Sequence, residues 1–196
     1  MLISSGITTI YLYLDFVMAR YAFPPDDAGM YTQAGSIARI ICFLTGPIIP
    51  AMFPKVADAT FRNDSVNTLF FRSLIMSALM ILAVSAFCYA FPGIPAKVLF
   101  GKTSHQMEQL SRLFIIAFAP VPLFIFLINF LMARQNFSFL IIQLLICSAY
   151  TIQVMIWHPG IYAVVCMIGV YAYLAFAVAL YHSLISIGAI RKRSAN

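Results

Sequence analysis

The sequence predicts an all-α integral membrane protein, with six transmembrane helices in a single domain. Hydrophobic residues make up 63% of the 196 positions and charged residues only 9%, and the mean hydropathy is +0.95. A soluble domain of this size would leave too much of that apolar surface in contact with water. The apolar residues also gather in stretches of about 20, the length that a helix needs to cross a bilayer.

Six stretches reach this length. In chain order the expected spans are residues 1–20, 33–53, 68–91, 113–132, 137–157 and 160–187. The spans are expected to be helices, because a barrel strand would read as about ten residues of alternating polarity. A helix satisfies its own backbone groups in lipid. The connections are short, so neighbouring spans are expected to pack as antiparallel hairpins.

Helix-breaking residues separate or bend the first spans. Pro24, Pro25 and Gly29 predict a short outer loop over residues 21–30. Three prolines, Pro47, Pro50 and Pro54, predict that the second span is bent, because each removes a backbone hydrogen bond.

Two longer polar segments connect later spans. Residues 55–67 have apolar side chains near helical spacing and are expected to form a helix along the inner membrane surface. Residues 96–112 are expected to be the longest outer loop, and residues 133–136 a tight turn between the fourth and fifth spans.

The basic residues predict the orientation in the membrane. If the N-terminus is inside, the inner side holds seven basic residues against four on the outer side; the seven are Lys55, Arg62, Arg72, Arg134, Arg191, Lys192 and Arg193. This bias predicts that both termini lie in the cytoplasm. We interpret the closing basic cluster as an anchor at the lipid headgroups and expect no nucleic-acid partner.

The sequence contains no pattern typical of catalysis or cofactor binding. Its four cysteines share no metal-ligand or redox spacing, and its three histidines are scattered near predicted helix ends. No glycine-rich phosphate loop is present. His105 and Glu108 are three positions apart, but a solvated surface explains them. We therefore expect no metal, no cofactor and no enzymatic activity.

Ionisable residues are few inside the predicted spans, and two of them, Asp15 and Arg39, lie well in from the span ends. Asp15 lies roughly 7–8 Å from the outer end of the first span and Arg39 roughly 9 Å from the outer end of the second. In an antiparallel hairpin these depths coincide, so the two side chains are expected to face each other or a shared cavity. An ionisable group at this depth costs on the order of 2–3 kcal/mol and normally has a partner or a function.

Two interpretations of the pair remain open. In the first, Arg39 clamps an anionic ligand and Asp15 is its counter-charge or a proton acceptor. In the second, the two residues form a structural ion pair, or Arg39 extends to the interface.

Tyr11 lies four residues before Asp15 on the same helix face and is a candidate cavity residue. Asn129, Gln143 and Gln153 either form interhelical hydrogen bonds or contact the ligand, and Asn129 is retained as a candidate for ligand binding.

Several short motifs carry a resemblance to a known family. They are Asp15 with Ala19-Arg20, Pro25–Tyr31, Ala38–Ile40, Met52–Val56, Phe70–Ser73, Leu99–Gly101 and Leu131–Arg134. In this order and spacing they resemble the C-terminal lobe of the polysaccharide-exporter branch of the multidrug/oligosaccharidyl-lipid/polysaccharide (MATE-like) superfamily.

The resemblance implies a transporter of twelve or fourteen helices in two lobes, of which this chain would be the second. Its cavity would bind an undecaprenyl-pyrophosphate-linked oligosaccharide at the cytoplasmic face of a bacterial inner membrane and release it outward. Arg39 with Asp15 match the cationic residues expected to meet the pyrophosphate. The partners implied are this lipid-linked oligosaccharide, membrane lipids, and either an N-terminal lobe or a second copy.

Two alternatives differ in function. The first is that the chain is the C-terminal lobe of a cation-coupled multidrug exporter, in which acidic cavity residues should predominate. One membrane acid with an arginine beside it favours an anionic substrate instead. The other alternative is a non-transporting assembly factor or remnant.

Overall fold

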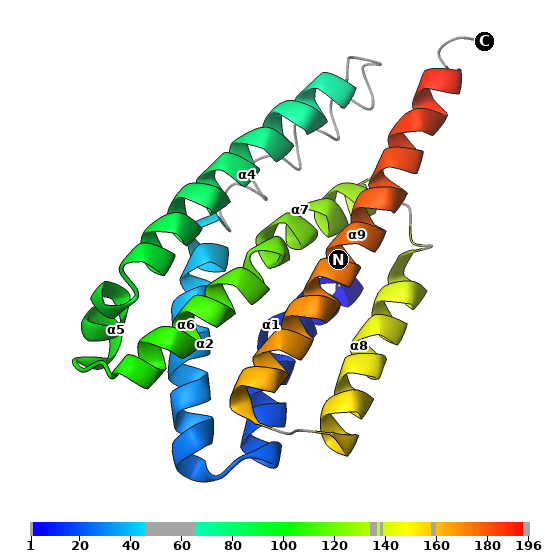
Figure 1. Ribbon diagram of the computed structural model, residues 1–196. Helices are drawn as coiled ribbons and strands as arrows, with labels where there is room; N and C mark the ends of the chain where they lie inside the picture. Colours follow the sequence, from blue (N-terminus) through cyan, green and yellow to red (C-terminus); the bar gives the residue numbers. More distant parts are fainter. Residues whose placement is uncertain (1, 46–65, 134–136, 138, 158–159, 194–196) are drawn as a thin grey trace.

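The part of the chain described by the structure, a computed structural model, is all-α, as predicted. It comprises residues 2–45, 66–133, 137, 139–157 and 160–193. The helices in this part are α1 (Leu2–Ala22), α2 (Pro25–Thr45), α4 (Val66–Ala90), α5 (Gly93–Phe100), α6 (His105–Phe118), α7 (Pro120–Ala133), α8 (Phe139–Ile156) and α9 (Ile161–Arg193) (Figure 1).

Within the residues that the structure describes, four helical segments are long and apolar enough to cross a membrane. They are Phe70–Ala90, His105–Met132, Phe139–Ile156 and Ile161–Ile187, and they correspond to the last four predicted spans. Their number and length are those of a helical membrane protein. Among the described residues, α1 and α2 have 21 residues each but do not join this set, so six spans stay a prediction.

The predicted outer loop over residues 21–30 is wrong. α1 continues to Ala22 and α2 begins at Pro25 rather than at residue 33. Proline fits the first position of a helix, where its missing N–H costs nothing and its fixed φ is already helical. Asp26 and Asp27 follow in the first turn, where carboxylates interact favourably with the helix dipole. The connection between the two helices is correspondingly tight.

The predicted loop over residues 96–112 is also wrong, because helix occupies most of it. α5 ends at Phe100 and is capped by Gly101, whose φ of 70° is easily adopted by glycine. α6 starts at His105 rather than at residue 113, since the Ser104 hydroxyl accepts a hydrogen bond from the Met107 N–H over 3.2 Å.

The predicted fourth span is interrupted near its middle. α6 ends at Phe118 and α7 begins at Pro120, which cannot donate the backbone hydrogen bond that would continue α6. The three prolines of the predicted bend in the second span, the surface-helix segment 55–65 and most of the turn at 133–136 lie outside the described residues.

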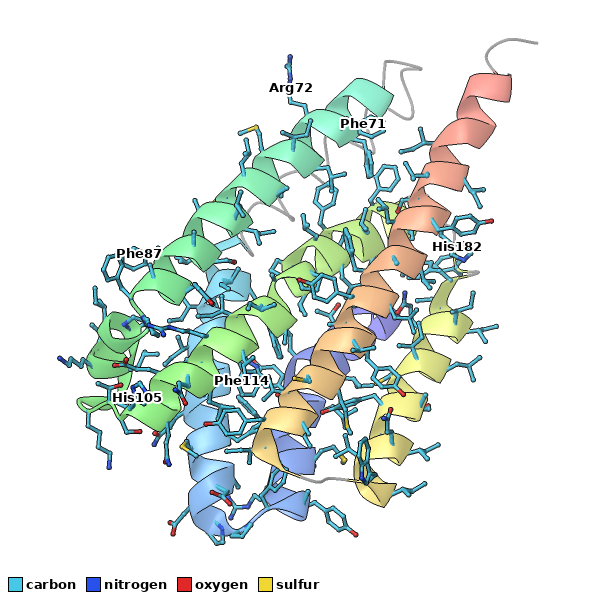
Figure 2. The ribbon with its side chains drawn as sticks, viewed as in Figure 1. Phe71, Arg72, Phe87, His105, Phe114 and His182 are labelled. Carbon is cyan, nitrogen blue, oxygen red and sulfur yellow. The ribbon has the colours of Figure 1, made fainter. Side chains whose placement is uncertain are left out.

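The pair α6–α7 forms the centre of the bundle. Within the segment His105–Met132, 67% of the most apolar window is buried by the rest of the chain, whereas the corresponding value for α4 is 17%. α9 packs against α6, α7 and α8, α2 packs against α6 and α1, and α1 also contacts α8. α4 lies along one side, where Phe71, Arg72 and Phe87 are exposed (Figure 2).

Candidate functional site

Asp15 and Arg39 form an ion pair between α1 and α2, so their predicted juxtaposition is confirmed. The Nη2 group of Arg39 donates to Oδ1 of Asp15 over 2.5 Å. The Nε group donates to the backbone carbonyl of Leu12 over 2.7 Å. The Arg39 side chain is 3% exposed and that of Asp15 is fully buried. Both acceptors belong to α1, so the guanidinium joins the first two helices at two points.

Aromatic rings surround the guanidinium. Its central carbon lies 3.7 Å from the centroid of the Phe16 ring and 4.6 Å from that of Phe118. The Tyr13 ring is farther away, at 5.9 Å. A cation over the face of an aromatic ring is attracted by the ring quadrupole, more strongly when water is excluded. Three elements, α1, α2 and α6, therefore contribute to the environment of this one charge.

Gly35 provides the space that the guanidinium occupies. A Cβ atom at this position would lie 2.8 Å from Nη1 of Arg39 and 2.9 Å from Cε1 of Phe16. Gly35 precedes Arg39 by one helical turn and follows Tyr31 by one turn, so the three residues share a face of α2. The arginine can lie along its own helix only because this position has no side chain.

Two buried polar atoms of the pair, Oδ2 of Asp15 and Nη1 of Arg39, have no hydrogen-bond partner among the described residues. A buried polar group without a partner costs about 1–3 kcal/mol. The ion pair is thus only partly satisfied and keeps one acceptor and one donor for a further contact.

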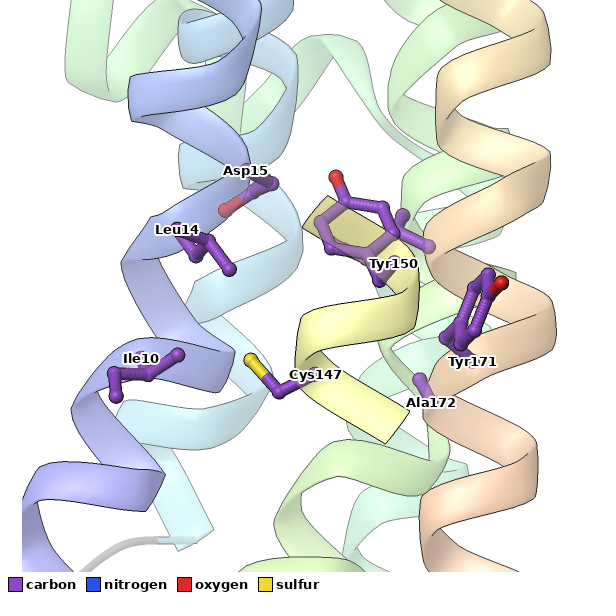
Figure 3. Close-up of a pocket in the computed structure, with 8 residues that line it drawn as sticks. Ile10, Leu14, Asp15, Cys147, Tyr150, Tyr171 and Ala172 are labelled. Carbon is purple, nitrogen blue, oxygen red and sulfur yellow. The ribbon is translucent and has the colours of Figure 1, made fainter. Parts of the chain in front are cut away.

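Asp15 and Tyr150 line the same small cavity between α1, α8 and α9 (Figure 3). Its volume is about 20 Å³, which suffices for one water molecule. The other lining residues are Ile10, Leu14, Cys147, Ile168, Tyr171 and Ala172. The cavity is too small for a sugar or a phosphate in this arrangement of the helices.

The remaining candidates are not joined to the pair in the part of the chain that the structure describes. The amide of Asn129 donates to the carbonyl of Ile125, one turn back in its own helix, over 2.8 Å. The helix α1 includes Tyr11, but its side chain lies outside the described residues. A ligand-binding role for either residue stays a prediction.

The two glutamines form interhelical hydrogen bonds, and this interpretation is confirmed. The Gln143 amide donates to the Ala175 carbonyl over 3.0 Å, and the Gln153 side-chain oxygen accepts from the Tyr171 hydroxyl over 2.6 Å. Both bonds connect α8 to α9. They stabilise the helix packing rather than the surroundings of Arg39.

Sequence reasoning missed several residues of the site, namely Tyr31, Gly35, Phe16, Phe118 and Tyr150. The spacing of Tyr31, Gly35 and Arg39 at successive turns was a usable signal for two of them. Phe118 and Tyr150 come from α6 and α8, and only the packing of the helices brings them near the pair.

Comparisons with family models, with curated proteins and with solved structures found no match. The exporter resemblance therefore rests on the sequence motifs alone.

Proposed function

We propose that the chain is one lobe of a polysaccharide-exporter-type transporter. It would move an undecaprenyl-pyrophosphate-linked oligosaccharide from the cytoplasmic to the outer leaflet of a bacterial inner membrane, with both termini in the cytoplasm. The sequence motifs and the four apolar helices support this proposal. The proposed transport breaks no covalent bond.

The observation that carries the proposal is the buried Asp15–Arg39 pair. A well-packed apolar pair of similar volume would cost no more stability than a buried ion pair, and often less. Charged residues inside a membrane bundle mark substrate or ion pathways in many transporters. The uncontacted Nη1 of Arg39 and Oδ2 of Asp15 leave the pair capable of exchanging partners.

The geometry suggests how Arg39 would meet a pyrophosphate. Both described hydrogen bonds of its guanidinium end on α1, at Asp15 and at the Leu12 carbonyl. A displacement of α1 relative to α2 would therefore release both bonds together. The freed guanidinium could then donate two parallel hydrogen bonds to phosphate oxygens. A proton taken up by Asp15 would remove the competing negative charge.

The same pair disfavours the multidrug-exporter alternative. A site for cationic drugs needs an acidic residue whose charge is available. Here the Asp15 carboxylate contacts Arg39 at 2.5 Å, so the pair as a whole is neutral. Release of Arg39 from Asp15 exposes a cation for which an anionic substrate is the natural partner.

A variant in which both residues are uncharged distinguishes a loss of transport from a loss of structure. In the host organism, the gene is replaced by the Asp15→Asn/Arg39→Gln variant, and by Asp15→Asn alone as the control that keeps the cation. We expect the double variant to insert at the normal level, to lose most surface glycan and to accumulate lipid-linked oligosaccharide facing the cytoplasm. Because Asp15→Asn leaves the buried Arg39 without its counter-charge, export is compared per amount of protein in the membrane, and on that basis the control should retain measurable export. Normal glycan display by the double variant would contradict the proposal.

A further inference from the structure

An apolar groove runs between α2, α4 and α5, and neither Asp15 nor Arg39 lines it. Its volume is about 450 Å³. Its walls are formed by Ile40, Leu44, Ala83, Val84, Phe87, Cys88, Ile94, Pro95, Val98 and Leu99. All ten are hydrophobic, and several are open on one side: Phe87 is 52% exposed and Val98 is 80% exposed. The groove is thus a lateral opening and not part of the packed core.

The position of the groove relative to the bilayer follows from the helices on either side of it. α5 and residues 101–104 join the end of Phe70–Ala90 to the start of His105–Met132. Because both segments are candidate spans, α5 lies at one membrane surface. From there the groove extends along α4, whose apolar window is only 17% buried by this chain. In the part of the chain that the structure describes, its open side would then face the hydrocarbon of one leaflet.

Two lysines lie close in sequence to residues that line the groove, one in α5 and one directly after its capping residue. Lys97 follows Ile94 by three positions in α5, so the two are neighbours on that helix. Lys102 comes directly after Gly101, which ends α5. Both lysines are exposed. Glu108 lies in the first turn of α6, and its Oε1 accepts a hydrogen bond from the Thr103 hydroxyl over 3.3 Å.

We propose that this groove binds one acyl chain of an anionic phospholipid, whose phosphate is held by Lys97 and Lys102. An apolar channel that opens to hydrocarbon, with cations on and next to the surface helix α5, matches both parts of such a lipid. The bound chain would fill the space between α4 and the two helices beside it. This lipid site is separate from the Asp15–Arg39 pair and does not depend on the transport proposal.

Tryptophan fluorescence can test the site, because the chain contains a single tryptophan, Trp157. A Trp157→Phe background removes the native signal, and Phe87→Trp places a reporter in the groove. Ala86→Trp is the matched control, an exposed position one residue earlier in α4 that does not line the groove. The purified proteins are reconstituted in phosphatidylcholine vesicles with increasing fractions of phosphatidylglycerol. In each series one of the two lipids has brominated acyl chains, which quench tryptophan fluorescence.

We expect brominated phosphatidylglycerol to quench the groove reporter at a several-fold lower mole fraction than brominated phosphatidylcholine. The control reporter should not distinguish the two lipids. Lys97→Gln/Lys102→Gln should abolish the preference at the groove.

Three outcomes would overturn the proposal. Equal quenching by both lipids at Phe87→Trp, or the same preference at Ala86→Trp, would mean ordinary lipid solvation of α4. A preference that survives the double lysine change would mean that the cations do not hold the headgroup. An unquenched groove reporter beside a quenched control would mean that protein, such as a second lobe or copy, covers the groove.

Discussion

Arg39 of α2 binds two acceptors on α1, the carboxylate of Asp15 and the carbonyl of Leu12, three residues apart. The carboxylate and the carbonyl thus fix the height of α2 relative to α1, and the rings of Phe16 and Phe118 fix the plane of the guanidinium. A charge held in this way can stabilise the bundle and can also serve as a switch. Variants of the pair and of its surroundings distinguish the two effects.

The first prediction concerns the removal of one partner. Arg39→Ala leaves the fully buried carboxylate of Asp15 without its counter-charge, and we expect a loss of about 3–5 kcal/mol of stability. The Asp15→Asn/Arg39→Gln variant buries no net charge and should lose much less. Thermal unfolding in detergent measures both. A double variant as unstable as Arg39→Ala would show that the charge itself is not the cause.

The second prediction concerns the space beside the guanidinium. Gly35→Ala would place a methyl group 2.8 Å from Nη1 of Arg39 and 2.9 Å from the Phe16 ring. We expect a destabilisation of about 1–3 kcal/mol from overpacking. Gly29→Ala is the matched control in the same helix, since a Cβ there meets nothing within 4 Å. If the two variants unfold at the same temperature, Arg39 does not depend on Gly35.

A third prediction concerns the contact between α6 and α9. A Cβ atom at Gly169 would lie 3.2 Å from the Cβ of Ala117, and small residues allow such close approach of membrane helices. Gly169→Val should separate the two helices and destabilise the bundle by about 1–3 kcal/mol. Ala177→Val adds similar bulk at an exposed position of α9. An unfolding temperature that drops equally for both would refute the close-packing argument.

The fourth prediction concerns the hydrogen bond between Tyr171 and Gln153. Tyr171→Phe removes the donor of this 2.6 Å bond. Interhelical hydrogen bonds in membrane proteins contribute about 0.6 kcal/mol on average, so we expect a small decrease in unfolding temperature. Tyr181→Phe, at a position 63% exposed on the same helix, should have no effect. A large loss, above about 2 kcal/mol, would indicate a further role for the Tyr171 hydroxyl.

The sequence predicted that Asp15 and Arg39 meet, but the depths on which this prediction rested do not match. Asp15 lies seven residues before the end of α1 at Ala22, whereas Arg39 lies 14 residues after the start of α2 at Pro25. The two meet because the long arginine side chain extends past Gly35 to the carboxylate.

Hydrophobic length identified the four apolar helices. The predicted starts of α2 and α6 are too late, because polar residues at a helix start resemble those of a loop. These residues are Asp26 and Asp27 in α2 and the capping residue Ser104 before α6.

The rest of the site depended on tertiary packing. Phe118 belongs to α6 and Tyr150 to α8, and no local pattern marks either as a neighbour of α1 or α2. The break between α6 and α7 at Pro120 was likewise hidden inside a continuous apolar stretch. Sequence periodicity describes one helix at a time, whereas the partners of Arg39 are set by how the helices pack.

The central claim is that Arg39 meets a lipid-linked oligosaccharide, and photocrosslinking in native membranes tests it most directly. A photoreactive benzoylphenylalanine replaces Tyr13, whose ring lies 5.9 Å from the guanidinium carbon and whose side chain is 42% exposed. After illumination, the purified protein is probed for attached glycan. We predict a crosslink that Asp15→Asn/Arg39→Gln abolishes and that a benzoylphenylalanine at the distant, exposed Leu79 does not give. No glycan at Tyr13, or glycan that persists in the neutral variant, would contradict the account.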